Sequence, residues 1–218
     1  MSLEGYSAPP VPGGVIEGAH VTLRPLAVSD AAEMWPEVAG HDALWDYLAT
    51  PVPQDEAAFA AHIAALVEKP DDVAMAVLRG GKVVGHFLFM RLDRPNGAGE
   101  IGWVLLAPSL QKTTAASEAF HLAIRHLFDL GYRRVEWKCN AANRGSRRAA
   151  QRLGFSYEGV FRQHMIAKGE NRDSAWFAII DSEWPGIRAA HEGWLADPEA
   201  ARLSDLTRPL LHQTDPAL

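Results

Sequence analysis

Residues 99–120 restrict the possible folds of this chain more than any other stretch. The spacing of their hydrophobic residues changes in the middle, from every second residue to a helical period. Before Pro108 the residues alternate, with Ile101, Trp103 and Leu105 on one side of the pattern, which predicts a strand. Pro108 ends that strand because proline has no backbone N–H donor. Apolar residues then recur at helical spacing, and Gly131 fits the C-cap position. The stretch therefore predicts a strand, a tight loop and a helix.

The start of that helix is a candidate anion-binding site. The first backbone N–H groups of a helix have no internal partners, and the helix macrodipole adds positive potential there. Small residues at 113–117 leave those groups accessible, and Lys112 adds a positive charge. The simpler alternative is an ordinary strand–helix connection with Thr113 or Thr114 as the N-cap.

Taken in order, the periodicities predict the element order β-α-α-β-β-β-α-β-α-β-β. Three hairpin-linked strands before one parallel β-α-β crossover favour a mixed α/β or α+β sheet, with helices on its faces, over a doubly wound parallel sheet. We expect a flexible leader at 1–14, a single domain at 15–197 and a C-terminal tail at 198–218.

Composition excludes several classes of function. The formal net charge of -6 disfavours general binding to nucleic acid or to an anionic membrane. Cys139 is the single cysteine, so no intrachain disulfide can form, and the spacings contain no HExxH or CxxC pattern, so we expect no metal site. Without a membrane-spanning apolar run or a signal pattern, the sequence predicts a cytoplasmic protein.

A second polar group follows the strand predicted at 133–139. Asn143 fits the N-cap of a short helix, and Ser146 lies three residues later. In a parallel β-α-β crossover the carboxyl ends of both strands lie at the same sheet edge, so the two helix starts face one cleft. The alternative for Asn143 and Ser146 is plain helix capping. A solvated helix face is the alternative for the arginines of this helix, which are Arg144, Arg147, Arg148 and Arg152.

Together these residues resemble the GNAT superfamily of acyl-CoA-dependent N-acetyltransferases, and within it the branch with the ribosomal-protein N-terminal acetyltransferases. The resemblance covers the element order from about residue 20 to about residue 185. Its specific part is about 99–160, and the motifs that carry it are the 100–120 stretch, Asn143-x-x-Ser146, and Arg152-Leu153-Gly154-Phe155 followed by Glu158-Gly159. It implies a GNAT-like mixed, mostly antiparallel sheet in which acetyl-CoA, the co-substrate, lies between two splayed parallel strands, 100–106 and 133–139.

By the same resemblance, the pyrophosphate loop falls on residues 111–116. Thr114 stands where the family usually has Gly, a departure that matters only if the position requires a positive φ. The implied cofactor-binding residues are Val104, Leu105 and Leu106 on the strand, Gln111, Lys112, Thr113, Thr114, Ala115 and Ala116 in the loop, and Asn143, Arg147 and Arg148 on the second helix.

Acetyl transfer from a thioester to an amine needs a neutral amine, a donor to the carbonyl oxygen and stabilisation of the leaving thiolate. The resemblance implies that Ser146 protonates the thiolate and that Asn143 orients CoA. Glu100 lies on the cleft strand and is the candidate to accept the amine proton, with a salt bridge or a solvated carboxylate as its alternative. A histidine base at His86 or His164 is the other option.

We expect the acceptor pocket to be built from the helical region at 29–53 and from the turn between the last two strands. The candidate side chains there are Trp45, Tyr47, Arg162, His164 and Arg172, with core packing as the alternative for Trp45 and solvent exposure for Arg172. The sequence leaves the acceptor open among a peptide N-terminus, an aminoacyl-nucleotide-like antibiotic and a small amine.

The leading hypothesis is therefore an N-acetyltransferase that moves an acetyl group from acetyl-CoA to a primary amine by direct attack in a ternary complex. The alternative, favoured by Thr114, is a catalytically inactive acyl-CoA-binding or protein-interaction module of the same fold. Binding of nucleic acid through the arginine-rich helix is disfavoured by the acidic total charge. A homodimer through the segment with Trp184 and Trp194 is a further hypothesis.

Overall fold

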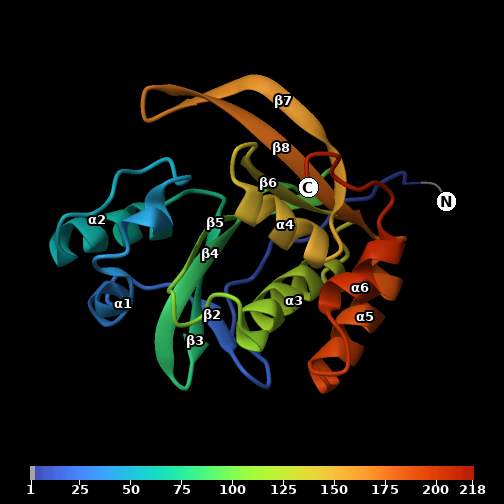
Figure 1. The fold of residues 1–218 in the computed structure, drawn as a ribbon, viewed down its shortest axis with the longest axis horizontal. Helices are drawn as coiled ribbons and strands as arrows, with labels where there is room; N and C mark the ends of the chain where they lie inside the picture. Colours follow the sequence, from blue (N-terminus) through green and yellow to red (C-terminus); the bar gives the residue numbers. More distant parts are fainter. Residues whose placement is uncertain (1–2) are drawn as a thin grey trace.

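A computed structural model describes residues 3–218 of the chain (Figure 1). In this part of the chain one sheet has its strands in the order β1-β2-β3-β4-β5-β6-β8-β7. The strands are β1 (Ile16–Glu17), β2 (Thr22–Pro25), β3 (Val73–Arg79), β4 (Lys82–Asp93), β5 (Ala98–Leu106), β6 (Arg134–Asn140), β7 (Ser156–Ala167) and β8 (Glu170–Ile180). Among these described strands β5 and β6 are parallel and the other neighbours antiparallel, which confirms the predicted mixed sheet.

Helices cover both faces of the sheet. They are α1 (Asp30–Val38), α2 (Glu56–Val67), α3 (Thr114–Asp129), α4 (Arg144–Arg152), α5 (Trp184–Ala196) and α6 (Leu203–Thr207), with the 3-10 turns η1 (Asp42–Trp45) and η2 (Arg208–Leu210). On β4, His86 packs against His62 of α2, whereas Phe89 packs against His126 of α3. Odd and even strand positions point to opposite faces, so we name the two sides the α2 face and the α3 face. None of the helices in residues 3–218 has the length and apolar character needed to span a bilayer.

The parallel contact between β5 and β6 is short. It consists of three residue pairs and ends at Glu100↔Glu136. Beyond this point β5 stays paired with β4 as far as Leu106, and β6 stays paired with β8 as far as Asn140. The two strands therefore diverge in the middle of the sheet, and backbone groups on their facing edges are left without a neighbouring strand.

A β-bulge changes the direction of β5 at the same place. Three steps of β5, from Gly102 to Leu105, face two steps of β4, and Trp103 within this segment has a left-handed φ of 49°. A bulge shifts the alternation of side chains by one position, so Leu105 turns to the α2 face while Ile101 stays on the α3 face. The expected alternation through 101, 103 and 105 is therefore wrong beyond Gly102, because a period-2 pattern does not reveal an inserted residue.

The first described residues pack on the domain, unlike the flexible leader expected at 1–14. Ala8 and Val11 are buried in the core. The Tyr6 hydroxyl donates a hydrogen bond to the Gly131 carbonyl over 2.6 Å, and the Ala8 amide donates to the Arg94 carbonyl over 2.9 Å. Residues 1–14 are rich in Gly and Pro and have no periodic pattern, so the sequence does not predict these few apolar contacts. Residues 1 and 2 of the expected leader lie outside the described residues.

The C-terminal segment 198–218 also packs on the rest of the chain. Asp215 is buried, and its carboxylate accepts two hydrogen bonds from Arg147 of α4, one of them from Nε over 2.6 Å. The Tyr157 amide of β7 donates to the Gln213 carbonyl. The expected tail therefore covers α4 and β7 rather than standing apart from residues 15–197.

On the α3 face, α3 and α5 share a buried histidine pair. The Nδ1 atoms of His121 and His191 lie 3.3 Å apart, and Nε2 of His191 lies 3.1 Å from the Leu153 carbonyl oxygen. Burial lowers the pKa of His121 to about 4 and that of His191 to about 3. Both rings are therefore neutral at neutral pH, with one Nδ1 donating to the other.

Candidate active site

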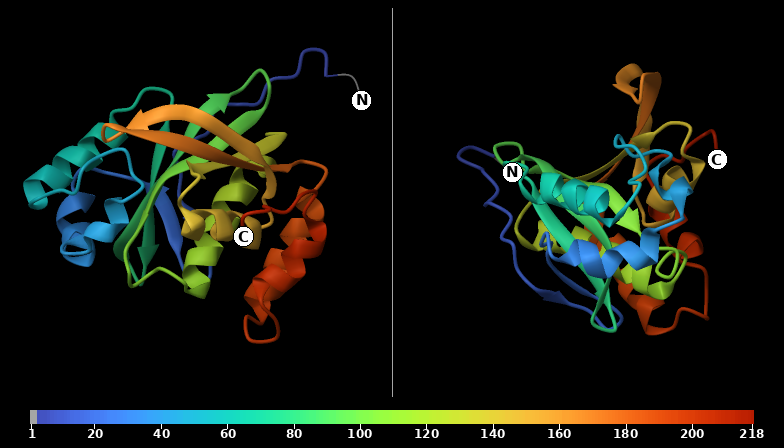
Figure 2. Two further views of the ribbon diagram at one scale, coloured as in Figure 1. Left: turned by 45° about the horizontal axis from the view of Figure 1, so that its top comes forward. Right: turned by 90° about the vertical axis from the view of Figure 1, so that its left-hand side faces the viewer.

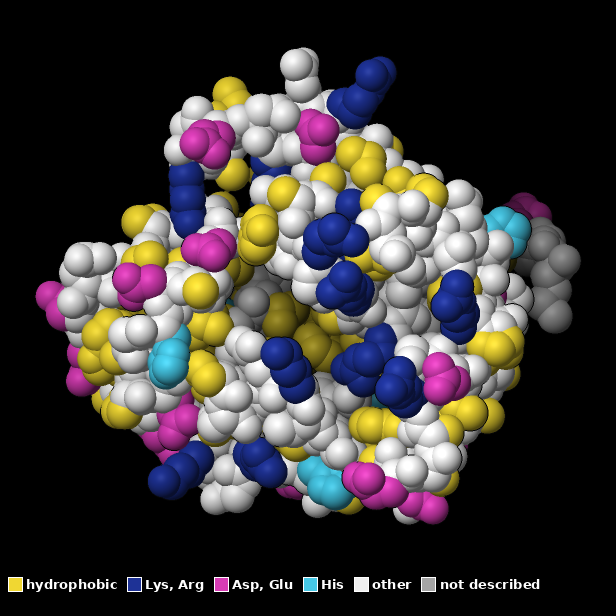
Figure 3. Space-filling model, viewed as in Figure 1, with side chains coloured by type: hydrophobic (Ala, Val, Ile, Leu, Met, Phe, Trp, Pro, Cys, Tyr) yellow, Lys and Arg dark blue, Asp and Glu magenta, His cyan; other side chains and the backbone are white. Residues whose placement is uncertain are grey.

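A cleft of about 1500 Å³ opens where β5 and β6 diverge. Its walls come from these two strands, the starts of α3 and α4, the segment around η1, the end of α5 and the β7–β8 hairpin. The space-filling view shows a hollow with an apolar floor and a rim of Lys and Arg side chains (Figure 3). Such a cleft suits a ligand that combines an apolar arm with negative charge.

The start of α3 forms one wall of the cleft. Thr113 is the N-cap, and its hydroxyl accepts a hydrogen bond from the Ala116 amide over 3.1 Å. The residue with positive φ in this loop is Lys112, at 59°, whereas Thr114 is the first residue of the helix. Thr114 therefore occupies a position that does not require glycine. The side-chain Nε2 of Gln111 donates to the Leu106 carbonyl over 2.9 Å and fixes the loop to the end of β5.

Cations surround this helix start. Lys112, Arg148 and Arg152 all line the cleft. Arg152 donates from Nη1 to the hydroxyl of Ser117 in the first turn of α3, over 3.0 Å. Burial lowers the pKa of the Arg152 guanidinium. The macrodipole of α3 and these three side chains together make this end of the cleft attractive to a phosphate group.

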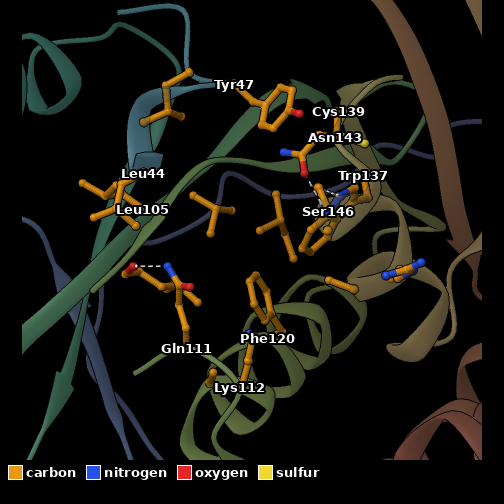
Figure 4. A pocket seen from close by; sticks show the side chains of 18 of the residues that line it. Leu44, Tyr47, Leu105, Gln111, Lys112, Phe120, Trp137, Cys139, Asn143 and Ser146 are labelled. Atoms are coloured by element: carbon orange, nitrogen blue, oxygen red, sulfur yellow. Dashed lines mark hydrogen bonds between the residues drawn. The ribbon is translucent and has the colours of Figure 1, made fainter. Parts of the chain in front are cut away.

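The start of α4 forms the opposite wall. Asn143 is its N-cap, and the side-chain oxygen accepts a hydrogen bond from the Ser146 amide over 2.9 Å. The Ser146 hydroxyl in turn accepts from Nε1 of Trp137 on β6, over 2.9 Å. Figure 4 shows these three side chains and Cys139 grouped on one side of the cleft. Burial raises the pKa of the Cys139 thiol to about 11, and a hydrogen bond with Ser146 opposes this shift.

Glu100 lies behind the cleft wall on the α2 face, with 2% of its surface exposed. Its Oε2 atom is 3.4 Å from Nε of Arg91 and 3.6 Å from Nζ of Lys138. Burial raises the pKa of the carboxyl, and the charges of Lys138 and Arg91 oppose that shift. A Cβ atom placed on Gly102 would lie 3.1 Å from Oε1 of Glu100, so the carboxylate borders the cleft at Gly102.

Two contacts join the walls of the cleft at the end near η1. The Tyr47 hydroxyl donates to the Ala142 carbonyl over 3.4 Å, between the segment after η1 and the loop before α4. Nζ of Lys168, at the tip of the β7–β8 hairpin, donates to the Trp45 carbonyl over 2.6 Å. The hairpin projects from the body of the molecule in Figure 2, and the Lys168 contact joins its tip to η1. At the end near η1, the cleft is therefore bridged by one contact to the loop before α4 and by one contact to the β7–β8 hairpin.

The structure brings most of the predicted site residues to this cleft. The predicted residues that line it are Tyr47, Val104, Leu105, Leu106, Gln111, Lys112, Thr113, Thr114, Ala116, Asn143, Ser146, Arg148 and Arg172. Those that lie outside its lining are Trp45, Glu100, Ala115, Arg147, Arg162 and His164. Trp45 is 1% exposed and packs edge-on against Phe59 in the core, and Arg147 turns away to Asp215. His164 contacts Ser174 through Nδ1 over 2.9 Å.

Some residues that line the cleft are not predicted from the sequence. Lys138 is one of them, although the alternation along β6 could have identified it. It alternates with Trp137 and Cys139 and therefore points to the α2 face. Met90 and Gly102 also line the cleft, and nothing in their local pattern marks them. Within residues 3–218 no group of three His, Cys, Asp or Glu side chains is arranged to hold a metal ion.

A mixed sheet with one short, diverging parallel pair of strands is the fold of GNAT acetyltransferases. The acetyltransferase (GNAT) domain family matches residues 20–156, and the chain belongs to this family. The predicted resemblance is confirmed over the part of the chain that carries the cleft strands and both helix starts.

Solved structures and curated relatives agree with this family. A GCN5-related N-acetyltransferase from Brucella melitensis is 35% identical, with a TM-score of 0.90 over 94% of this chain and 100% of that one. The uncharacterized N-acetyltransferase YnaD of Bacillus subtilis is 29% identical over 47% of this chain, a match that spans 59% of YnaD. The ribosomal L7/L12 N-acetyltransferase RimL, at 21% identity and a TM-score of 0.66 over 79% of this chain and 94% of RimL, shares the fold.

Proposed function

We propose that this chain transfers an acetyl group from acetyl-CoA to a primary amine by direct attack in a ternary complex. The single observation that carries the proposal is the divergence of β5 and β6 beyond Glu100, directly opposite the start of α3. An extended pantetheine arm can add to the free edge of β5 as a strand would. A neighbouring helix N-terminus can then hold the pyrophosphate.

The residues around the cleft fit acetyl-CoA in charge and in polarity. The backbone groups of Val104 and Leu106 lie on the divergent edge of β5 and are suited to the amides of the arm. Lys112 and Arg148 supply positive charge beside the N-terminus of α3. When bound, acetyl-CoA supplies a thioester as the activated acetyl donor.

Ser146 is our candidate for the group that gives a proton to the departing sulfur. Its oxygen already accepts a hydrogen bond from Trp137, so its own proton is available to another acceptor. Asn143 holds the first turn of α4 and so keeps the hydroxyl at the cleft wall.

Glu100 is our candidate for the acceptor of the amine proton. Its carboxylate borders the cleft beside Gly102, where the Met90 thioether also packs. A carboxyl whose pKa is raised by burial is a stronger base than an ordinary glutamate. The charges of Lys138 and Arg91 favour its ionised form and hold it in position. A purely structural ion pair is the alternative role.

The inactive-module alternative rested on Thr114. Its location at the first turn of α3 removes that argument, because a residue in helical conformation needs no glycine. The N-acetyltransferase is therefore the function we favour.

The test combines binding and turnover. Acetyl-CoA is titrated calorimetrically into the protein, and CoA release is then followed with a panel of amines, for the natural chain and for Ser146→Ala. We expect saturable binding in both proteins and amine-dependent CoA release that is strongly reduced in Ser146→Ala. Absence of binding heat with acetyl-CoA would overturn the proposal, and binding without acetylation of any amine would favour the inactive module.

A further inference from the structure

The α2 face of the cleft carries more positive charge than its own carboxylate can balance. Arg91, Lys138 and Arg172 are three cations on this side, and Glu100 is the carboxylate that pairs with the first two. Arg91 and Lys138 also lie over the ring of Trp176, each 5.3 Å from its centroid. These two cations are therefore held in place by the protein itself.

Arg172 is held differently. It lies on β8, faces Met165 of β7 in the register of the hairpin, and lines the cleft together with Lys138. Within residues 3–218 its side chain forms no ion pair and no hydrogen bond, and its Nε atom is a buried donor without a partner. Its sequence neighbour Asp173 forms no ion pair with it and instead accepts hydrogen bonds at Oδ1 from the Gln163 amide and from Asn171.

An arginine beside a second cation, with a buried donor left unpaired, is costly unless something binds to it. Burial lowers the pKa of Lys138, and the like charges of Arg91 and Arg172 act in the same direction, against the effect of Glu100. The cleft also contains Asp42 and Glu199, and neither forms an ion pair with Arg172 or Lys138 within residues 3–218. A ligand with negative charge would pair with the Arg172 guanidinium and add to the ion pair that Lys138 forms with Glu100.

We infer that the acceptor of this enzyme is an amine that also bears an anionic group, a carboxylate or a phosphate, bound by Arg172 and Lys138. The inference rests on the proposed N-acetyltransferase function and adds the chemical class of the acceptor. The planar guanidinium of Arg172 suits two-point binding of either anion, while Lys138 supplies a second charge. The amine of the same molecule then lies toward Gly102 and Glu100, where the two strands diverge.

Matched pairs of acceptors test this inference in the presence of acetyl-CoA. One pair is the dipeptide amides Ser-Glu and Ser-Gln, and the other is phosphoethanolamine and ethanolamine. We expect kcat/KM to be at least about tenfold higher for the anionic member of at least one pair, since a charged hydrogen bond contributes that much discrimination. The pair with the larger ratio identifies carboxylate or phosphate as the natural anion.

The variant Arg172→Gln should reduce kcat/KM for the preferred anionic amine to the level of its neutral partner. The value of kcat/KM for the neutral partner should fall much less than that for the anionic amine, since the neutral partner makes no charged contact to lose. Arg188→Gln, which removes an exposed arginine of α5, is the matched control and should keep the preference. Equal rates for both members in the natural chain, or equal losses for both in Arg172→Gln, would overturn the inference while leaving the transferase intact.

A second readout separates this inference from the proposed function. Phosphoethanolamine and Ser-Glu amide are titrated calorimetrically into the protein without acetyl-CoA. Heat that is present in the natural chain and lost in Arg172→Gln supports the anion site even if no amine is acetylated. Absence of heat from both anionic amines, together with absence of any anionic preference in turnover, overturns it.

Discussion

Nε1 of Trp137 donates a hydrogen bond to the hydroxyl of Ser146 over 2.9 Å, and this contact joins β6 to the first turn of α4. Phe120 and Phe155 pack against the indole ring, with ring centroids 5.1 and 5.6 Å away, and hold it in one orientation. A rigid donor on the serine oxygen limits the directions in which the hydroxyl proton can point. Trp137 is therefore a positioning residue for Ser146.

The first prediction compares Ser146→Ala with Trp137→Phe. Ser146→Ala should lower kcat by about 100-fold, the lower range for loss of a general acid, with little change in the KM for acetyl-CoA. Trp137→Phe keeps an aromatic ring but removes the donor, so kcat should fall only by about fivefold, the value of one hydrogen bond. Steady-state CoA release measures both. A larger loss in Trp137→Phe than in Ser146→Ala would contradict a role that acts through the serine.

The second prediction separates two adjacent arginines. Arg147→Ala should reduce the free energy of unfolding by about 3–5 kcal/mol, because it leaves the buried Asp215 carboxylate without its partner. Arg148→Ala should leave that free energy within about 0.5 kcal/mol but weaken acetyl-CoA binding, most strongly at low salt. Urea denaturation and calorimetry measure the two effects. Asp215→Ala is the control for Arg147→Ala, and recovery of stability in Arg147→Met with Asp215→Leu would confirm the cause.

The third prediction concerns the loop before α3. Thr114→Gly should lower stability by about 0.5–1 kcal/mol, the cost of glycine inside a helix, without tightening acetyl-CoA binding. Lys112→Gly should raise stability by about 1 kcal/mol because it relieves a left-handed φ, yet weaken binding because it removes a charge. Thermal unfolding and calorimetry on the same samples check the opposite signs. Tighter binding in Thr114→Gly would mean that the loop changes conformation around the ligand.

The fourth prediction uses the buried pair of His121 and His191. The folded-state pKa of His191 is about 3, whereas its ordinary value is 6.5, so the unfolded chain binds more protons between these two pH values. The free energy of unfolding should therefore rise with pH across this window, with a contribution from His191 of up to about 1.4 kcal/mol per pH unit. Stability is lost as pH falls below about 6.5. Urea denaturation at pH 5 and pH 7 should show a smaller difference for His191→Gln than for the natural chain, and an unchanged difference would refute this origin.

The sequence predicted the sheet and the two helix starts because their signals are local. A change of period at Pro108, small residues at 113–117 and an N-cap at Asn143 all lie within a few residues of the structure they specify. The cleft-facing loop could therefore be located without knowledge of the rest of the fold.

The remaining features depend on contacts between distant parts of the chain. Arg147 was a candidate for cofactor binding, but its partner Asp215 is 68 residues away and turns the side chain from the cleft. Trp45 was a candidate for acceptor binding and is instead covered by Phe59 of α2. The excess positive charge at Lys138 and Arg172 involves two strands, β6 and β8, that are distant in the sequence. It can therefore be recognised only from the pairing of these strands.

The bulge at Trp103 has a consequence for how this protein tolerates change over evolutionary time. A substitution in β5 alters one side chain, whereas a deletion of one residue between Gly102 and Leu105 would restore ordinary pairing with β4 and send every later side chain to the opposite face. The sheet would survive such a deletion and the cleft would not. The number of residues in this strand is therefore expected to be under stronger selection than their identity.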